Sequence, residues 1–156
     1  MKKAFTMIEL IFVIVILGIL AAVAIPKLNA TRDDAEITKG VSNFSTLLGD
    51  IASYYTAKGS FATNIQDMTN VVMQPHTSNT STAYLYIKDL NCVTINAESS
   101  GSTIKIFASP DFDKGVCKSF FATSSVKAAM GNKDIKNHQG IASAYEIKLG
   151  GGNVNF

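Results

Sequence analysis

The N-terminal part of the chain is a long apolar segment that carries one charge. Between Lys3 and Lys27 lie 23 residues, and Glu9 is the one charged side chain among them. The 22 residues at positions 4–25 would form a helix of about 33 Å, which is enough to cross a bilayer core of about 30 Å. We therefore predict a transmembrane helix at residues 5–26.

The distribution of charge indicates how this helix is oriented. Lys2 and Lys3 precede the apolar segment, and basic residues favour the cytoplasmic side of a membrane, so we expect a cytoplasmic N-terminus and an exported remainder. The same two lysines account for the net charge of +2, because the other 12 of the 14 basic side chains balance 12 acidic ones. This balance argues against a nucleic-acid partner that is bound by bulk charge.

An ordinary secretory signal peptide is the alternative interpretation of this segment. Residues 1–3 and the small residues Ala22-Val23-Ala24 fit its basic region and its cleavage pattern. Glu9 and Pro26 fit it poorly, because one is a charge in the apolar region and the other follows the cleavage site almost at once. This alternative predicts a freely secreted binding module that begins near Ile25.

The first part of the sequence also carries a recognisable pattern. It consists of a short basic leader, a Phe-Thr pair, an acid four residues further on, an apolar run and a proline, in the residues Lys3-Ala4-Phe5-Thr6-Met7-Ile8-Glu9, Gly18, Ala21–Ala24 and Pro26. This pattern resembles the N-terminus of type IV pilins and type II secretion pseudopilins over about the first 30 residues.

The resemblance implies a processing event. A prepilin peptidase would remove the leader, residues 1–4, by cutting between Ala4 and Phe5, and the new amine of Phe5 would be methylated. The family usually has glycine directly before the cut, whereas this chain has alanine there. Because alanine is also small, we expect cleavage to be retained.

The resemblance also implies partners and a location. We expect a structural subunit of a filament that contains copies of this chain and other pilins or pseudopilins. Its further partners would be the prepilin peptidase, an inner-membrane assembly platform and membrane lipid. The subunit would lie in the bacterial inner membrane and then in a periplasmic or extracellular filament. A minor filament-priming or DNA-uptake pseudopilin is the alternative, and the residues do not separate a pilus from a secretion role.

Glu9 requires an explanation, because an isolated carboxylate in a membrane costs on the order of 3 kcal/mol. Phe5 and Glu9 are spaced i and i+4, on one helix face, and the amine of Phe5 exists as a cation only after the leader is removed. The resemblance implies that this amine meets Glu9 of a neighbouring subunit and sets the register of the filament. The alternative is a glutamate that reaches toward the membrane surface without a role.

Two residues in the apolar segment weaken helical structure. Gly18 destabilises a helix by about 1 kcal/mol relative to alanine, and Pro26 lacks an N–H and crowds the carbonyl of Ala22. From the resemblance we expect the stretch from Gly18 to Pro26 to lose helicity on assembly. A static kink is the alternative.

An amphipathic stem helix is predicted at residues 27–58. Its apolar positions are spaced by three and four residues, as one face of a helix requires: Ile37, Val41, Phe44, Leu48, Ile51 and Tyr55. Gly59 is a candidate for the residue that ends it. One helix would then run from Phe5 to about Ala57.

Residues 59–156, which we call the headpiece, are predicted to be rich in β-structure. Alternating patterns between turn-forming breaks predict strands at 83–88, 92–97, 103–108, 116–122 and 145–149. The residues around Ser124-Ser125 predict a short capped helix. The expected fold is therefore α+β, with a long N-terminal helix packed against a small antiparallel sheet.

The chain has two cysteines, Cys92 and Cys117. His76 and His138 form no metal-ligand spacing with them, so a disulfide in an oxidising compartment is predicted, with two buried thiols as the alternative. If both cysteines lie on strands of a simple meander, a third strand separates them by more than the roughly 7 Å that a disulfide spans. Either they meet at strand ends or the strand order is not a meander.

Asp111 and Asp113 precede Gly115 and are the one candidate for a cofactor site. They are compatible with the start of a calcium loop, but no glutamate follows at loop spacing, so a plain turn is the preferred interpretation. The sequence contains no phosphate-binding loop, dinucleotide glycine pattern or hydrolase nucleophile motif. We therefore expect no catalytic residues, no other cofactor and no enzymatic activity.

Overall fold

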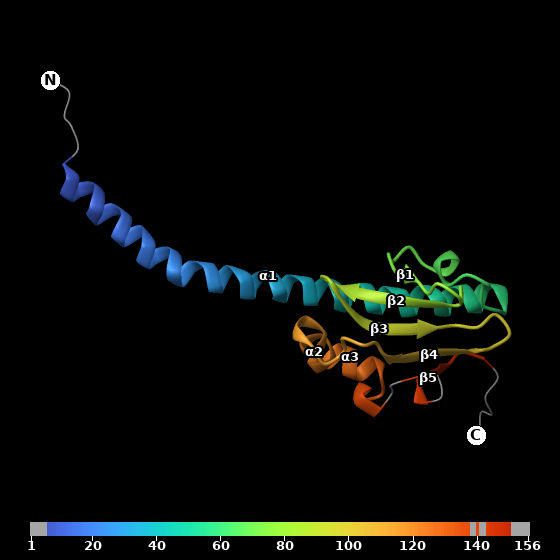
Figure 1. Ribbon diagram of the computed structural model, residues 1–156. Helices are drawn as coiled ribbons and strands as arrows, with labels where there is room; N and C mark the ends of the chain where they lie inside the picture. Colours follow the sequence, from blue (N-terminus) through green and yellow to red (C-terminus); the bar gives the residue numbers. More distant parts are fainter. Residues whose placement is uncertain (1–5, 138–139, 141–142, 151–156) are drawn as a thin grey trace. The chain divides into compact units, whose positions relative to one another are not determined.

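The computed structural model describes residues 6–137, 140 and 143–150. It divides the chain into two compact units, Met1–Ala35 and Glu36–Phe156. Helix α1, Met7–Lys58, begins in the first unit and ends in the second (Figure 1). The predicted cleavage site between Ala4 and Phe5 lies outside the described residues.

The first unit is helical from Met7 and leaves its apolar side chains exposed. Every large apolar side chain from Met7 to Leu28 is exposed. In the described part of the chain, α1 is the helix whose length and composition suffice to cross a membrane. Because apolar surface of this extent is unfavourable in water, the segment requires lipid or neighbouring chains around it.

Gly18 and Pro26 both lie inside α1. A Cβ atom added to Gly18 would meet no other atom within 4 Å, so no packing contact explains the glycine. Both positions are helical in this structure. Their loss of helicity on assembly therefore stays a prediction.

The part of α1 in the second unit provides one wall of the core. Its fully buried apolar side chains are those of Phe44, Leu47 and Ile51. Ile37, Val41, Leu48 and Tyr55 are partly buried and pack against this core, so the predicted stripe is confirmed. Leu47 was missed because the buried face of a helix is about 100° wide, which is broader than a single line of residues.

The predicted end of the helix is also confirmed. Gly59 has a φ of 76°, and its N–H donates to the carbonyl of Tyr55 at 2.8 Å. This left-handed conformation is one that glycine adopts without steric cost. Helix α1 therefore ends at Lys58.

Among the residues that the structure describes, five strands form one antiparallel sheet in the order β1-β2-β3-β4-β5. The strands are β1 (Gln74–Pro75), β2 (Thr82–Ile87), β3 (Leu90–Asn96), β4 (Thr103–Ala108) and β5 (Tyr145–Lys148). The order is a meander. The last four confirm predicted strands to within two residues, whereas β1 is only two residues long and contains a proline, which leaves no strand pattern to detect.

The sheet packs on α1 through alternating side chains. Ala83, Leu85 and Ile87 of β2 are buried together with Val93 and Ile95 of β3, which lie opposite in the register. The rear part of α1 runs along this sheet in Figure 1. The predicted α+β fold, a long helix packed against a small antiparallel sheet, is confirmed.

The predicted strand at 116–122 is wrong, because this segment is helix α2, Gly115–Ala122. Its buried residues are Val116, Cys117 and Phe120, a spacing that fits a helix. The segment is too short for the spacing of its apolar residues to distinguish the repeat of a helix from the repeat of a strand. Helix α3, Ser124–Ala129, follows and confirms the predicted short helix, whereas the predicted cap is wrong, because the N-cap residue is Thr123 and its side chain makes no capping hydrogen bond.

Two short 3-10 helices complete the described elements of the headpiece. They are η1 (Ile65–Met68) and η2 (Ile135–Asn137). The side chain of Asn64 caps η1 by accepting a hydrogen bond from the N–H of Gln66 at 3.1 Å. Helix η1 contacts β2, and η2 contacts β4.

Candidate assembly site and the disulfide loop

The first turn of α1 is closed by a reciprocal pair of residues, Thr6 and Glu9. Glu9 Oε2 accepts hydrogen bonds from the backbone N–H of Thr6 at 2.8 Å and from its hydroxyl at 2.6 Å. The N–H of Glu9 donates to Thr6 Oγ1 at 3.3 Å. This arrangement is a capping box, which satisfies two N–H groups that a helix start otherwise leaves without partners.

Sequence reasoning missed Thr6 as the partner of Glu9. The segment Thr6-Met7-Ile8-Glu9 has the threonine-to-glutamate spacing of a capping box, so the signal was present. The amine of Phe5, which was the predicted partner, lies outside the described residues. The structure therefore gives Glu9 a partner within its own chain and leaves the Phe5 contact as a prediction.

The surroundings of Glu9 define the chemistry that this end of α1 offers. Its neighbours Met7, Ile8, Leu10 and Ile11 are exposed apolar side chains. The site is thus a single carboxylate on an apolar helix surface, held in position by a hydroxyl and a backbone N–H. Such a group can bind one cation or hydrogen-bond donor brought by another chain.

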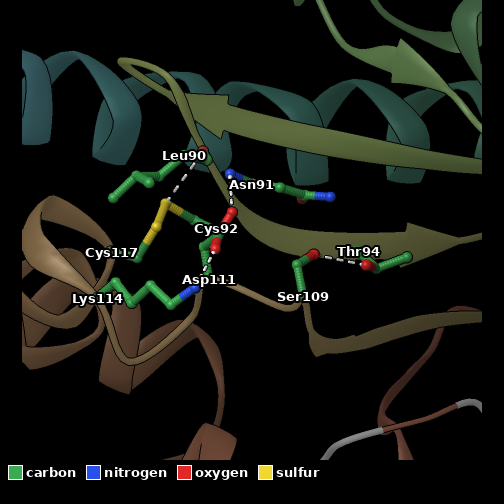
Figure 2. Close-up of a disulfide and its surroundings, with 8 residues drawn as sticks. All are labelled: Leu90, Asn91, Cys92, Thr94, Ser109, Asp111, Lys114 and Cys117. Carbon is green, nitrogen blue, oxygen red and sulfur yellow. Dashed lines mark hydrogen bonds and ion pairs between the residues drawn. A yellow bond between two sulfur atoms is a disulfide. The ribbon is translucent and has the colours of Figure 1, made fainter.

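The disulfide joins Cys92 of β3 to Cys117 of α2, with the two Cα atoms 5.1 Å apart (Figure 2). Both cysteines are fully buried. The predicted disulfide is therefore present, and the alternative of two buried thiols is wrong. The predicted conflict with a meander disappears, since the sheet is a meander but Cys117 lies on a helix beside it.

The disulfide closes a loop that contains most of β3 and all of β4. With a sequence separation of 25 residues, the loss of chain entropy in the unfolded state corresponds to about 3.5 kcal/mol of stabilisation. The bond therefore ties helix α2 to the sheet.

Asp111 fixes the turn that leads into α2. Its Oδ1 forms an ion pair with Lys114 Nζ at 2.8 Å, and its Oδ2 accepts the N–H of Asn91 at 3.3 Å (Figure 2). The hydrogen bond from Lys114 is the main reason that the pKa of Asp111 is lowered, and the same contact raises the pKa of Lys114. The turn is thus attached to the start of β3.

This geometry bears on the calcium candidate. The carboxylate of Asp111 already binds the ammonium group of Lys114, which occupies the position that a cation would need. Within the described ranges, no group of three or more His, Cys, Asp or Glu side chains is placed to hold a metal ion. Calcium at Asp111 and Asp113 therefore stays an untested alternative to the preferred turn, and the contacts that are present are those of a turn.

Comparison with known proteins adds independent observations. The family model for the prokaryotic N-terminal methylation motif matches residues 1–25. The type IV wide pilus major component PilA4 of Thermus thermophilus is 32% identical over 123 residues, which cover 79% of this chain and 92% of that protein. The type II secretion system core protein G of Escherichia coli is 27% identical over 124 residues, which cover 73% of this chain and 86% of that protein.

The type II secretion system core protein G of Dickeya chrysanthemi is 32% identical over 76 residues, which cover 49% of this chain and 50% of that protein. The chain thus spans about half the length of the first curated relatives that it matches. No solved structure matches it.

These observations converge on one class of protein. A membrane-length apolar helix that begins with the Thr6–Glu9 capping box and leads into an α+β headpiece defines a membrane-anchored subunit with a helical stem. The match to PilA4 extends this likeness over most of both chains. The chain belongs to the type IV pilin and pseudopilin family.

Proposed function

We propose that this chain is a structural subunit of a type IV pilus-like filament, as a pilin or a type II secretion pseudopilin. One observation carries the proposal: an exposed apolar helix surface begins at a single carboxylate, Glu9, that is held in place by Thr6. A subunit that moves from lipid into a fibre needs an apolar surface that suits both environments. The extended similarity to a pilus major component supports the same role.

The proposed layout has four parts. A leader at residues 1–4 is removed by prepilin peptidase, residues 5–26 cross the inner membrane, residues 27–58 form the stem, and residues 59–156 form the exported headpiece. Lys2 and Lys3 support a cytoplasmic N-terminus. The buried disulfide supports export of the headpiece, because such bonds persist in oxidising compartments.

The proposed assembly step exchanges partners at Glu9. Before cleavage the carboxylate is satisfied by Thr6, so the precursor can be stored in the membrane. After cleavage between Ala4 and Phe5, the methylated amine of Phe5 supplies a cation to Glu9 of a neighbouring copy. The assembly platform and membrane lipid are the other proposed partners, and the balanced charge argues against nucleic acid as a partner bound by bulk charge.

The proposal assigns the chain no enzymatic activity and no resident cofactor. Its role is to form contacts, and its relatives are named as a pilus component and as secretion core proteins. The sequence contains no nucleotide-binding or hydrolase motif.

Mass spectrometry and filament counting test this proposal together. The full chain, extracted from membranes of cells that contain the peptidase, should lack residues 1–4 and carry one extra methyl group at Phe5. Glu9→Ala should insert and be cleaved normally but form far fewer filaments, whereas Glu9→Asp should keep part of the ability to form filaments. An intact leader, a new N-terminus near Ile25 or normal filaments from Glu9→Ala would contradict the proposal.

A further inference from the structure

The headpiece contains a groove with an apolar floor and a basic rim, which we call the lysine groove. It has a volume of about 750 Å³ and lies among α2, α3 and η2. Partly or fully buried apolar side chains form its floor: Phe112, Phe121, Val126, Met130 and Ile135. Four exposed lysines form its rim, Lys118, Lys127, Lys133 and Lys136, against two aspartates, Asp113 and Asp134.

A second hollow of about 350 Å³ lies between α1 and η1 and carries the opposite charge. We call it the acidic face, and its lining includes Asp50, Asp67, Tyr54 and Asn70. Asp50 Oδ2 accepts a hydrogen bond from the hydroxyl of Thr69 at 2.7 Å, which fixes its carboxylate in place. Among the described residues that line this hollow, none is a lysine or an arginine.

The two surfaces are separate hollows of the headpiece. Helix η1 contacts β2, whereas η2 contacts β4, and β3 lies between these strands. Figure 1 shows α2 and α3 away from the segment that follows α1 and precedes β1. The lysine groove and the acidic face of one copy have no lining residue in common.

We propose that the lysine groove of one copy binds the acidic face of a second copy. The two surfaces are complementary in charge, and they are different patches, so the contact is head-to-tail. Contacts of this kind leave a free patch at each end and generate open helical assemblies. The inference rests on the proposed filament function and names a second interface, in the headpieces, beside the one at the N-terminal helix.

The two kinds of side chain have separate tasks in this contact. The lysines and aspartates at the rim select the partner and accelerate encounter more than they add affinity. The floor side chains Phe112 and Phe121 offer apolar surface, and Tyr54 of the acidic face is the aromatic group that suits it, since buried aromatic anchors provide most of the energy of an interface.

Zero-length crosslinking of carboxylates to amines tests the contact directly. Filaments of the full wild-type chain should give crosslinked peptides that join Lys118 or Lys127 to Asp67 or Asp50. The same treatment of detergent-solubilised monomers should not, because these residues line two separate hollows of one headpiece. Absence of these peptides from filaments, or equal yields from monomers, would overturn the proposal.

Charge reversal gives a second test with matched controls. Lys127→Glu and Asp67→Lys should each lower filament yield at least threefold, an order-of-magnitude expectation for like charges brought together at an interface. The combined variant should recover most of the yield. Lys148→Glu and Glu98→Lys make the same charge changes on exposed residues outside both surfaces, and they should assemble like the wild type.

The outcomes separate this inference from the proposed function. Recovery in the combined variant excludes misfolding as the cause of the single defects. If the single variants match the controls while Glu9→Ala fails to assemble, the headpiece interface is wrong and the filament function stands. If the wild-type chain forms no filaments, both are wrong.

Discussion

The carboxylate of Glu9 accepts two hydrogen bonds from Thr6, one from its backbone N–H at 2.8 Å and one from its hydroxyl at 2.6 Å. The acid that the membrane would otherwise destabilise is therefore part of the local structure that starts α1. This relationship gives Glu9 a role in the unassembled subunit, before any neighbour supplies an amine. Loss of the Thr6 side chain should therefore remove both a helix cap and a hydrogen-bond donor to Glu9.

Thr6→Ala should loosen the first turn of α1. Loss of a capping side chain costs about 1 kcal/mol of helix stability, and it also leaves the Glu9 carboxylate without its hydroxyl donor. Hydrogen exchange at the amides of residues 7–10 in detergent should become faster. Thr6→Ser keeps the hydroxyl and is the matched control, so equal exchange in the alanine and serine variants would contradict this role.

Gly40→Ala should destabilise the second unit although alanine favours helices. A Cβ atom at Gly40 would lie 2.6 Å from Ile87 Cδ1, and such overpacking costs about 1–3 kcal/mol. Denaturant unfolding of the full chain in detergent measures the change. Gly49 is the matched control, since a Cβ atom there meets nothing within 4 Å. Gly49→Ala should stabilise the helix by about 1 kcal/mol.

A double variant tests whether contact with Ile87 explains the effect of Gly40→Ala. Gly40→Ala combined with Ile87→Ala removes both side-chain atoms that the new Cβ atom would meet most closely, Cδ1 at 2.6 Å and Cγ1 at 2.8 Å. Measured relative to Ile87→Ala alone, part of the stability lost on Gly40→Ala should be recovered. No recovery would mean that the close approach of α1 to β2 is not what requires glycine.

Removal of the disulfide should destabilise the headpiece by about 3.5 kcal/mol. Cys92→Ala combined with Cys117→Ala is the suitable variant, because both side chains are fully buried and a serine hydroxyl would have to be buried as well. The free energy of unfolding should fall to that of the reduced wild-type chain. A double variant as stable as the oxidised protein would show that the bond does not restrain the unfolded chain.

The ion pair between Asp111 and Lys114 should make the turn before α2 sensitive to acid. The folded-state pKa of Asp111 is lowered, mainly by the hydrogen bond from Lys114. The pair therefore contributes stability above the ordinary aspartate pKa of about 3.9 and loses it as the pH falls through the lower folded value. Lys114 is 62% exposed, so solvent screening keeps the effect small.

Thermal melts between about pH 6 and pH 2 measure this effect. Lys114→Gln should show a shallower loss of stability at the acidic end than the wild type. Lys118→Gln removes the same charge one helical turn further on and should leave the profile unchanged. In the same assay, millimolar calcium should not shift the wild-type melt, and a clear upward shift would favour a calcium loop at Asp111 and Asp113 instead of the turn.

Patterns that extend over many residues were predicted correctly from the sequence. The apolar run around Glu9 and the stripe through Phe44 and Ile51 are long enough to define a helix, and four strands show partial alternation between turn-forming breaks. The prediction of a strand at 116–122 was wrong because this short segment with paired apolar side chains fits a strand and a helix about equally well, and the helix allows the disulfide to Cys92.

Features that depend on tertiary structure could not be predicted from the sequence. The lysines of the groove are spread from position 118 to 136, and only the packing of α2, α3 and η2 brings them to one rim. The two residues of β1 pair with β2 but carry no pattern of their own. Thr6 is different, because the sequence itself contains the capping-box spacing between Thr6 and Glu9.

The order of the strands has a consequence for how the sheet is completed. Strands β1 to β4 follow one another closely in the chain, so each can pair with its predecessor as the chain is made. Strand β5 can pair with β4 only after α2 and α3 have been synthesised. Until then β4 has an open edge that another chain can pair with. The Cys92–Cys117 bond lies within the part of the chain that precedes β5, so it can hold α2 beside the sheet before this edge is covered.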